Sequence, residues 1–173
     1  MTPGSSTRAI TQRILCRVFL FLITLSLVIV LITLVEQRQI NLPANDFTMY
    51  WSSAKLLISG DNPYDPVGLA RLQNQATGRD TATVLMYYPP WSLLWIAPLA
   101  LLQHNVSQVV WLLIQTSVVF ACTDQIWLHI GGSVRYRWIA WLIAFSFGPT
   151  FSALGYTGQL TPLLLLGITY IFL

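Results

Sequence analysis

The sequence is poor in charged residues, and this scarcity decides its class. Of its 173 residues, 9% are charged and 55% are hydrophobic, whereas soluble domains carry roughly a quarter charged residues. A soluble globular domain is therefore excluded. Transmembrane barrel strands alternate apolar and polar residues over about ten positions, but the apolar runs here are continuous. The sequence thus predicts an all-α, multi-pass transmembrane bundle, because helices satisfy their own backbone hydrogen bonds in lipid.

Several kinds of site are also missing. The two cysteines, Cys16 and Cys122, lie inside apolar runs without metal-ligand spacing, so we interpret them as small buried hydrophobes. The sequence contains no glycine-rich phosphate loop, no nucleophile elbow and no zinc-ligand spacing. We expect no cofactor, and a divalent metal is a minor alternative because no Asp-x-Asp pair occurs. The net charge of +3 is small, so nucleic acid is not an expected partner.

Five apolar runs divide the chain. Residues 1–13 are polar and are expected to form a disordered cytoplasmic N-terminus. The run 14–35 is long enough to span a hydrocarbon core of about 30 Å, and it is longer than the apolar part of a signal peptide. We therefore interpret it as a retained first transmembrane helix. Residues 84–173 are expected to hold transmembrane helices 2–5, with runs at 84–102, 106–130, 138–154 and from 160 onward.

The last run is short, because the chain stops at Leu173 before it has enough residues to cross a bilayer comfortably. We therefore expect the last transmembrane helix to be truncated and the sequence to be the N-terminal part of a longer protein.

Between the first two runs lies a polar segment, residues 36–83, which holds five of the six acidic residues. Asn45-Asp46 can cap a short amphipathic helix over 47–59, which is suited to lie in a membrane interface. Asp65-Pro66 predicts the start of a second short helix that runs to about residue 76. The polar face of the first of these juxtamembrane helices would carry Thr48, Ser52, Lys55 and Ser59.

The arginines give two conflicting signals about topology. Three of them lie within the first 17 residues and place the N-terminus in the cytoplasm under the positive-inside rule. Residues 36–83 then form an extracytoplasmic loop of a multi-pass plasma-membrane protein. If every later run crosses the membrane, Arg135 and Arg137 are also outside, against the same rule. Either the rule is overridden here or one proline-rich segment is re-entrant, and the sequence leaves both alternatives open.

An ordered set of short motifs resembles the multi-pass GT-C glycosyltransferases. Within them it resembles family 87, which includes bacterial polyprenyl-phosphate-mannose-dependent mannosyltransferases. The order and spacing of the motifs carry the resemblance, because no single motif is specific. The set consists of Asp46-Phe47 with Tyr50-Trp51, the stretch 56–66 around Asn62-Pro63-Tyr64, Tyr88-Pro89-Pro90 with Pro98-Leu99, and Gly158-Gln159.

The resemblance implies transfer of a hexose, with mannose as one candidate, from a polyprenyl-phosphate donor to a lipid or glycan acceptor outside the cytoplasm. It implies inversion at the anomeric carbon and Asp46 as the general base that takes the proton of the acceptor hydroxyl. The same carboxylate is also suited to cap the following helix, and the two roles are compatible. The alternative function is a small non-catalytic membrane protein, either an assembly partner or a lipid-binding subunit.

Four further residues are candidate substrate-binding residues, and each has a second reading. Lys55 could reach a lipid phosphate as a point charge or meet anionic headgroups of membrane lipids. Tyr64 and Tyr88 could stack on a sugar ring or belong to an aromatic belt at the interface. Gln159 could hydrogen-bond a substrate or form a plain interhelical turn.

Asp124 is the acidic residue that lies inside an apolar run, where acids are candidates for a functional role. It could pair with the nearby His129, or it could reach the membrane interface from its position near the end of the run. His104, between the second and third runs, is expected to be a loop residue.

Overall fold

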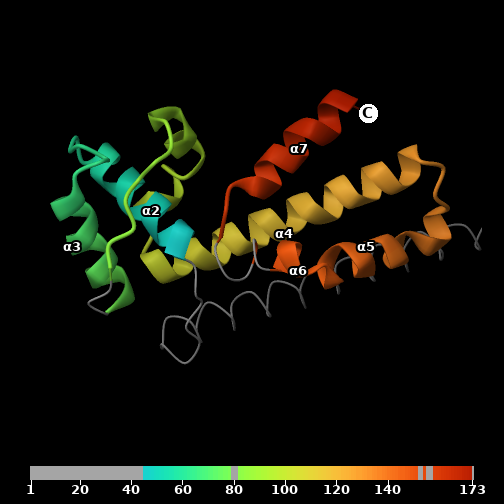
Figure 1. The fold of residues 1–173 in the computed structure, drawn as a ribbon, viewed down its shortest axis with the longest axis horizontal. Coiled ribbons are helices and arrows are strands. Elements are labelled where there is room, and N and C mark those ends of the chain that lie inside the picture. The colour runs from blue at the N-terminus through green and yellow to red at the C-terminus, as the bar shows by residue number, and fades with distance from the viewer. Residues whose placement is uncertain (1–44, 79–81, 152–153, 155–157, 173) are drawn as a thin grey trace, which may run out of the picture. The chain divides into compact units, whose positions relative to one another are not determined.

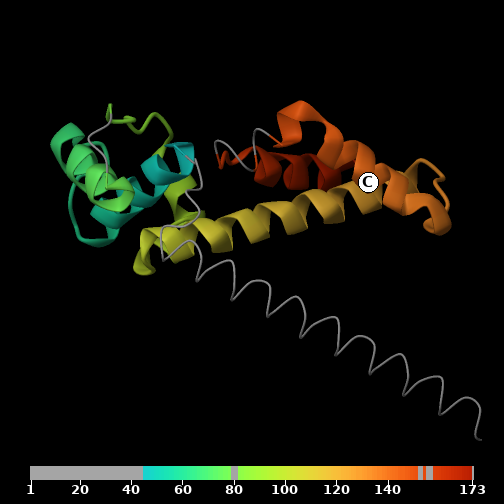
Figure 2. The same cartoon turned by 90° about the horizontal axis from the view of Figure 1, so that it is seen from below.

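The computed structural model describes residues 45–78, 82–151, 154 and 158–172. The chain divides into two compact units, Met1–Ile40 and Asn41–Leu173, and all described residues belong to the second. Every regular element among them is a helix, and these residues contain no strand (Figure 1, Figure 2). The predicted N-terminus and the predicted first transmembrane helix lie outside the described residues.

Two short helices, α2 at Asn45–Ile58 and α3 at Pro66–Thr77, form where local sequence signals predict them. The side chain of Asp65 accepts hydrogen bonds from two backbone N–H groups in the first turn of α3, and Pro66 occupies the first helical position. Gly78 ends α3 with a left-handed backbone at φ 65°, a conformation that glycine adopts without steric cost. The placement of these helices beside a membrane stays a prediction.

The cap at Asp65 leads to a first testable prediction. Replacing Asp65 with Ala removes the acceptor of two N–H groups and should lower the free energy of unfolding by about 1 kcal/mol. The midpoint of heat unfolding in detergent can be followed by the reaction of buried Cys122 with a thiol-reactive dye, in a Cys16→Ser background. Asp61→Ala is the matched control, because Asp61 is exposed and caps no helix among the described residues. Equal shifts in the two variants would contradict the prediction.

The N-terminal part of the polar face of α2 is buried, which the prediction of an interfacial helix did not include, whereas Lys55 is half-buried and Ser59 is exposed. Thr48 and Ser52 are 6% and 0% exposed. The Ser52 hydroxyl donates to the carbonyl of Met49 at 3.0 Å and accepts from the amide of Gln73 at 3.3 Å. Because buried hydroxyls of this kind find hydrogen bonds inside the protein, both faces of a helix can be covered. α2 is therefore a central helix of the core.

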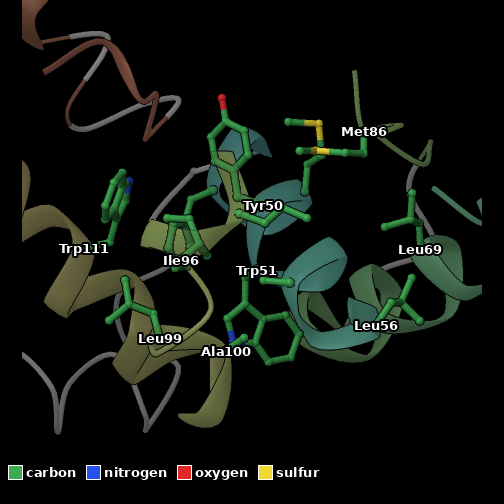
Figure 3. Close-up of a cluster of buried hydrophobic side chains, with 13 residues drawn as sticks. Tyr50, Trp51, Leu56, Leu69, Met86, Ile96, Leu99, Ala100 and Trp111 are labelled. Carbon is green, nitrogen blue, oxygen red and sulfur yellow. The ribbon is translucent and has the colours of Figure 1, made fainter. Parts of the chain in front are cut away.

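The hydrophobic core gathers around α2 (Figure 3). Large side chains of α2 meet one residue of α3, the segment 86–100 and the first turns of α4, which spans His104–His129. Burial of this much apolar surface holds the N-terminal half of α2 in a defined position. The buried members are Phe47, Met49, Tyr50, Trp51, Ala54, Leu56, Leu69, Met86, Leu93, Ile96, Leu99, Ala100 and Trp111.

Gln73 of α3 fixes the extended segment that follows the two helices. Its side-chain N–H donates to the carbonyl of Val84 at 2.8 Å, and the N–H of Val84 donates back to the side-chain oxygen at 2.9 Å. The amide thus satisfies both backbone groups of Val84, as a neighbouring strand would. This contact holds the stretch that carries Tyr88 against α3.

Residues 84–102 do not form the continuous transmembrane helix that the sequence predicts. After the extended stretch, the chain makes two short 3-10 helices, η1 at Pro90–Trp95 and η2 at Leu99–Leu101. The physical reason is proline: Pro89-Pro90 lacks backbone N–H donors and disfavours helix before it, and Pro98 interrupts the next turn. A 3-10 helix of six residues rises about 12 Å, well short of the roughly 30 Å of a hydrocarbon core.

One helix within the described ranges, α4, is long and apolar enough to cross a membrane by length and composition. Its 26 residues reach about 39 Å at about 1.5 Å per residue. Two shorter apolar helices, α5 at Arg137–Ser146 and α7 at Thr161–Phe172, pack against it. The predicted multi-pass bundle is therefore supported as all-helical, while the number of crossings stays a prediction.

The short helix η3, Val134–Tyr136, connects α4 to α5, and α6, Gly148–Phe151, follows α5. α5 runs antiparallel to α4. Its first residue, Arg137, contacts Asp124 near the end of α4, whereas Trp141 and Phe145, later in α5, pack on Phe120, earlier in α4. α7 runs in the same direction as α4 in both views (Figure 1, Figure 2).

Candidate active site

Asp46 lies in the first turn of α2 and is half-buried. The N-terminal turn of a helix favours an anionic side chain, because the backbone N–H groups there have no partners within the helix. The neighbouring Phe47 is fully buried and anchors this turn in the core. The structure therefore holds the predicted general base at the edge of the core.

Tyr50 follows Asp46 by one helical turn and is the site residue that sequence reasoning missed. Its ring is fully buried and meets the ring of Tyr88 edge-on at 5.4 Å. Its hydroxyl points away from the apolar side chains in Figure 3 and makes no well-formed hydrogen bond with the described residues, although Tyr88 and the backbone of Leu160 are polar neighbours. The available signal was the spacing of four residues from an acidic residue, which puts two side chains on one helix face.

The surroundings of Tyr50 keep its hydroxyl protonated. Burial raises the pKa of Tyr50 well above its ordinary value, and the neighbouring Tyr88 and the negative charge of Asp46 raise it further. A tyrosine whose pKa is raised stays neutral at physiological pH, so its O–H remains available as a donor. The site thus places a carboxylate and a hydrogen-bond donor side by side.

The structure links two of the predicted binding residues, Tyr64 and Tyr88. The hydroxyl of Tyr64 donates to the backbone carbonyl of Tyr88 at 2.8 Å and so ties the α2–α3 turn to the extended segment. Both rings are exposed at their edges, with Tyr88 at 42%. Tyr88 in turn packs on Tyr50, which lies near the charge of Asp46, so Tyr50 and Tyr88 form a pair beside Asp46 and Tyr64 contacts this pair through the backbone of Tyr88.

The non-helical segment 158–160 precedes α7, and we call it the break. Its backbone is hydrogen-bonded to α4. The indole N–H of Trp111 donates to the carbonyl of Gly158 at 2.8 Å, and the side chain of Gln115 hydrogen-bonds the carbonyl of Gln159. The side-chain oxygen of Gln159 accepts from the hydroxyl of Thr161 at 3.2 Å. These contacts anchor the backbone of the break and hold Gln159 at the start of α7.

The break also approaches the first turns of α2. Trp111 stacks on Phe47 with ring centroids 6.2 Å apart, and Leu160 packs against the core cluster around α2. The backbone of Leu160 is close enough to influence the pKa of Tyr50. Segments more than 100 residues apart in the chain therefore meet beside Asp46.

Lys55 does not join this group. It lies nine residues after Asp46, which is about 13 Å along the helix axis. Its ammonium group donates to the carbonyl of Ala100 at 3.1 Å and so ties α2 to the end of η2. The structure gives Lys55 a defined role in packing, and phosphate binding stays a prediction.

His104 is the first residue of α4, which corrects the expectation of a loop residue. Its ring lies 5.9 Å from that of Phe47 and 5.2 Å from that of Trp51, and its Nε2 is 3.0 Å from the hydroxyl oxygen of Thr48. The contact with α2 was not visible in the sequence, because it joins residues 56 positions apart. His104 thus helps to hold α2 against the start of α4.

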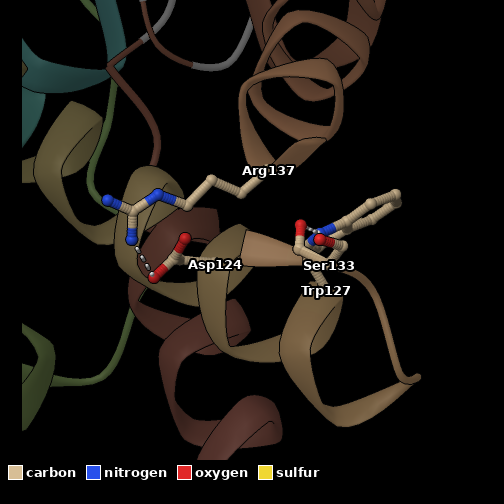
Figure 4. A network of polar contacts seen from close by, with 4 residues as sticks. All are labelled: Asp124, Trp127, Ser133 and Arg137. Atoms are coloured by element: carbon tan, nitrogen blue, oxygen red, sulfur yellow. Dashed lines mark hydrogen bonds and ion pairs between the residues drawn. The ribbon is translucent and has the colours of Figure 1, made fainter. Parts of the chain in front are cut away.

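Asp124 pairs with Arg137 of α5 and not with His129, which corrects the sequence-based pairing (Figure 4). The carboxylate and guanidinium groups are 3.6 Å apart, and the guanidinium also lies over the ring of Trp141. Two apolar helices are therefore joined by an ion pair near one end of α4. Nearby, the indole N–H of Trp127 donates to the carbonyl of Ser133 at 2.9 Å and closes the connecting loop (Figure 4).

Across the described ranges, no group of three or more His, Cys, Asp or Glu side chains comes together to hold a metal ion. Asp65 is the N-cap of α3, and Asp61 lies in the exposed turn between α2 and α3. The described residues place tyrosine hydroxyls and backbone groups beside the one carboxylate of Asp46.

A comparison with known protein families defines the class of this helical protein as glycosyltransferase. Residues 86–173 match the profile of glycosyltransferase family 87, which is just over half of the 173 residues. The chain belongs to glycosyltransferase family 87. Tyr88 and Gln159 fall within the matched residues, whereas Asp46, Lys55 and Tyr64 precede them. No curated protein and no solved structure matches the chain.

Proposed function

We propose that the protein is an integral plasma-membrane glycosyltransferase of the GT-C type. It transfers a hexose, with mannose as the sugar to test first, from a polyprenyl phosphate to a lipid or glycan acceptor on the extracytoplasmic side. Membership of family 87 supports glycosyl transfer. The observation that carries the proposal is the convergence of Asp46, Tyr50, Tyr88 and the break at 158–160 in one place.

In this proposal Asp46 is the general base. The oxygen of the acceptor hydroxyl attacks the anomeric carbon of the donor, and Asp46 takes the hydroxyl proton as the new bond forms. The bond from the anomeric carbon to the phosphate oxygen breaks, and its electron pair stays on the phosphate. Because a phosphate is a stable leaving anion, proton removal from the poorly nucleophilic hydroxyl is the step for which a positioned carboxylate is useful. Attack from the opposite face inverts the anomeric centre.

The remaining predicted residues surround this reaction in different ways. The ring of Tyr88, which packs on Tyr50, and the ring of Tyr64, whose hydroxyl is bound to the Tyr88 carbonyl, offer aromatic surface for a sugar ring. The side-chain amide of Gln159 offers donors and an acceptor for sugar hydroxyls. Lys55 can meet a lipid phosphate only if its ammonium group exchanges the carbonyl of Ala100 for that phosphate.

The proposal can be tested with a labelled polyprenyl-phosphate sugar and membranes that contain the complete gene product. A glycosyltransferase consumes the donor and transfers the label to an acceptor. A lipid-binding subunit binds the donor without consuming it, and a transporter moves it across vesicles unchanged. Donor binding without turnover, in membranes that supply acceptors, would replace the enzyme by the non-catalytic alternative.

Tyr50 is expected to donate its hydroxyl hydrogen to the bound sugar or phosphate. Replacing Tyr50 with Phe should lower kcat/KM about tenfold, because a hydrogen bond of this kind contributes about 1 to 1.5 kcal/mol. The midpoint of heat unfolding should stay equal or rise, because the hydroxyl makes no well-formed hydrogen bond with the described residues. Tyr87→Phe is the matched control, since Tyr87 is 78% exposed. A lower unfolding midpoint with unchanged transfer would assign the hydroxyl to the core alone.

A further inference from the structure

The segment 84–102 has two apolar faces. One face is part of the core, where Leu93 and Ile96 are fully buried against α2. The opposite face is rich in aromatic side chains and is exposed, because none of the described residues covers it. We call this exposed face the wedge, and it consists of Tyr87, Trp91, Leu94, Trp95 and Leu101, each between 68% and 78% exposed.

The composition of the wedge fits the headgroup region of a lipid bilayer. Tryptophan and tyrosine prefer this region, because each has a large apolar ring and one polar group that needs water. No Asp, Glu, Lys or Arg occurs between Asp80 and Asp124, so no charge competes with insertion of the wedge into lipid. A water-exposed apolar patch of this kind is uncommon on a protein that meets only water.

The wedge is also continuous with the candidate membrane-crossing helix. α4 begins at His104, three residues after the last wedge residue, Leu101. A segment that leads directly into a crossing helix must lie at the surface of the same membrane. Lipid is therefore the occupant that this face fits, in preference to a protein partner.

We infer that the wedge lies in the extracytoplasmic interface of the bilayer and that α4 is the crossing from that side to the cytoplasm. The inference depends on the proposed function in one respect: the proposed function places the site on the extracytoplasmic side. Both ends of the segment are held by the α2–α3 pair, Val84 by Gln73 of α3 and Ala100 by Lys55 of α2. Residues 84–102 therefore return the chain to the side on which this pair lies. The sequence left two explanations open for the arginines, an overridden positive-inside rule or a re-entrant proline-rich segment. The inference selects the second, with 84–102 as that segment.

This placement removes the conflict over the arginines. When 84–102 does not cross, the loop after α4 is cytoplasmic, and Arg135 and Arg137 obey the positive-inside rule together with the N-terminal arginines. The ion pair between Arg137 and Asp124 then lies near the cytoplasmic end of α4. α5, which is antiparallel to α4, leads back toward the side of Asp46, so the break at 158–160 can reach α2.

The sidedness can be measured with single cysteines in the complete gene product, in which Cys16 and Cys122 are replaced by Ala. Val67→Cys reports on α3 and Val134→Cys on the loop after α4; both valines are exposed, at 77% and 61%. With a membrane-impermeant maleimide, we expect Val67→Cys to be labelled on intact cells. Val134→Cys should not be labelled on intact cells and should be labelled only after the membrane is permeabilised. Labelling of both on intact cells would overturn the inference, because α3 and the loop after α4 would then lie on the same side, so that either α4 does not cross or residues 84–102 cross as well.

The depth of the wedge can be measured with the purified protein in phosphatidylethanolamine–phosphatidylglycerol vesicles. A Trp95→Cys variant carries an environment-sensitive fluorophore, and spin-labelled lipids quench it at known depths. We expect a blue-shifted emission that is quenched most by the lipid labelled nearest the headgroup. Emission as in water, or emission shielded from every labelled lipid as a protein partner would cause, would overturn the interfacial placement. Neither measurement needs sugar transfer, so an inactive protein with these results would refute the proposed enzyme and leave this inference standing.

Discussion

Replacing Asp46 with Asn is expected to lower the turnover number for sugar transfer by roughly 10²–10⁴-fold, which is the usual contribution of a general base. Asparagine has the same size as aspartate but cannot take up the proton of the acceptor hydroxyl at this position. Binding of the labelled donor should persist, because the change removes no group that is proposed to hold the phosphate. The rate is measured with the labelled polyprenyl-phosphate sugar in membranes that contain the complete gene product.

Two further measurements separate this role from a structural one. Asparagine is accepted at the start of a helix about as well as aspartate, so the midpoint of heat unfolding of Asp46→Asn should match that of the unaltered protein. Asp61→Asn is the matched control, because Asp61 is an exposed carboxylate in the turn after α2. Full activity in Asp46→Asn would remove Asp46 from the mechanism, whatever the control shows.

Replacing Trp111 with Ala is expected to lower the free energy of unfolding by about 3–5 kcal/mol. Trp111 is 2% exposed and joins three parts of the chain. It belongs to α4, its ring stacks on Phe47 of α2, and its indole N–H donates to the carbonyl of Gly158. Its removal leaves a cavity between these parts and frees the break at 158–160. The midpoint of heat unfolding, followed by the exposure of Cys122 in the Cys16→Ser background, measures the effect.

A graded series makes this prediction specific. Trp111→Phe keeps much of the buried ring but leaves the Gly158 carbonyl without its donor, and should cost about 1–3 kcal/mol. Trp138→Ala removes a tryptophan that is 52% exposed on α5 and should change the midpoint least. An equal effect of Trp111→Ala and Trp138→Ala would contradict the role of Trp111 as the joint between α2, α4 and the break.

Local signals in the sequence predict the short helices well. Asp65-Pro66 at the start of α3 and Gly78 at its end act through neighbours in the chain, so their effect does not depend on distant contacts. The long apolar run likewise predicts α4, which spans His104–His129. The prediction of a continuous transmembrane helix at 84–102 was wrong. It was based on hydropathy, which counts the apolar side chains, whereas the prolines determine the backbone conformation there.

The candidate site is predicted only in part. The motifs of the family resemblance singled out Asp46, Tyr88 and Gln159, and the roles of these residues stay predictions. Tyr50 was missed, because its importance comes from burial and from the approach of Tyr88, neither of which a sequence displays. The sequence offered His129 as one possible partner of Asp124, whereas the antiparallel course of α5 brings Arg137 to it.

By itself, the sequence determined the two short helices and the long apolar helix, and it showed the family resemblance that points to Asp46; the membrane class stays a prediction from its composition. All of these depend on composition or on residues close together in the chain. Only the tertiary structure decided that Thr48 and Ser52 on the polar face of α2 are buried and that the segment at 158–160 meets residues near 47. The physical reason is that packing joins distant segments through shape and hydrogen bonding, which local patterns do not encode.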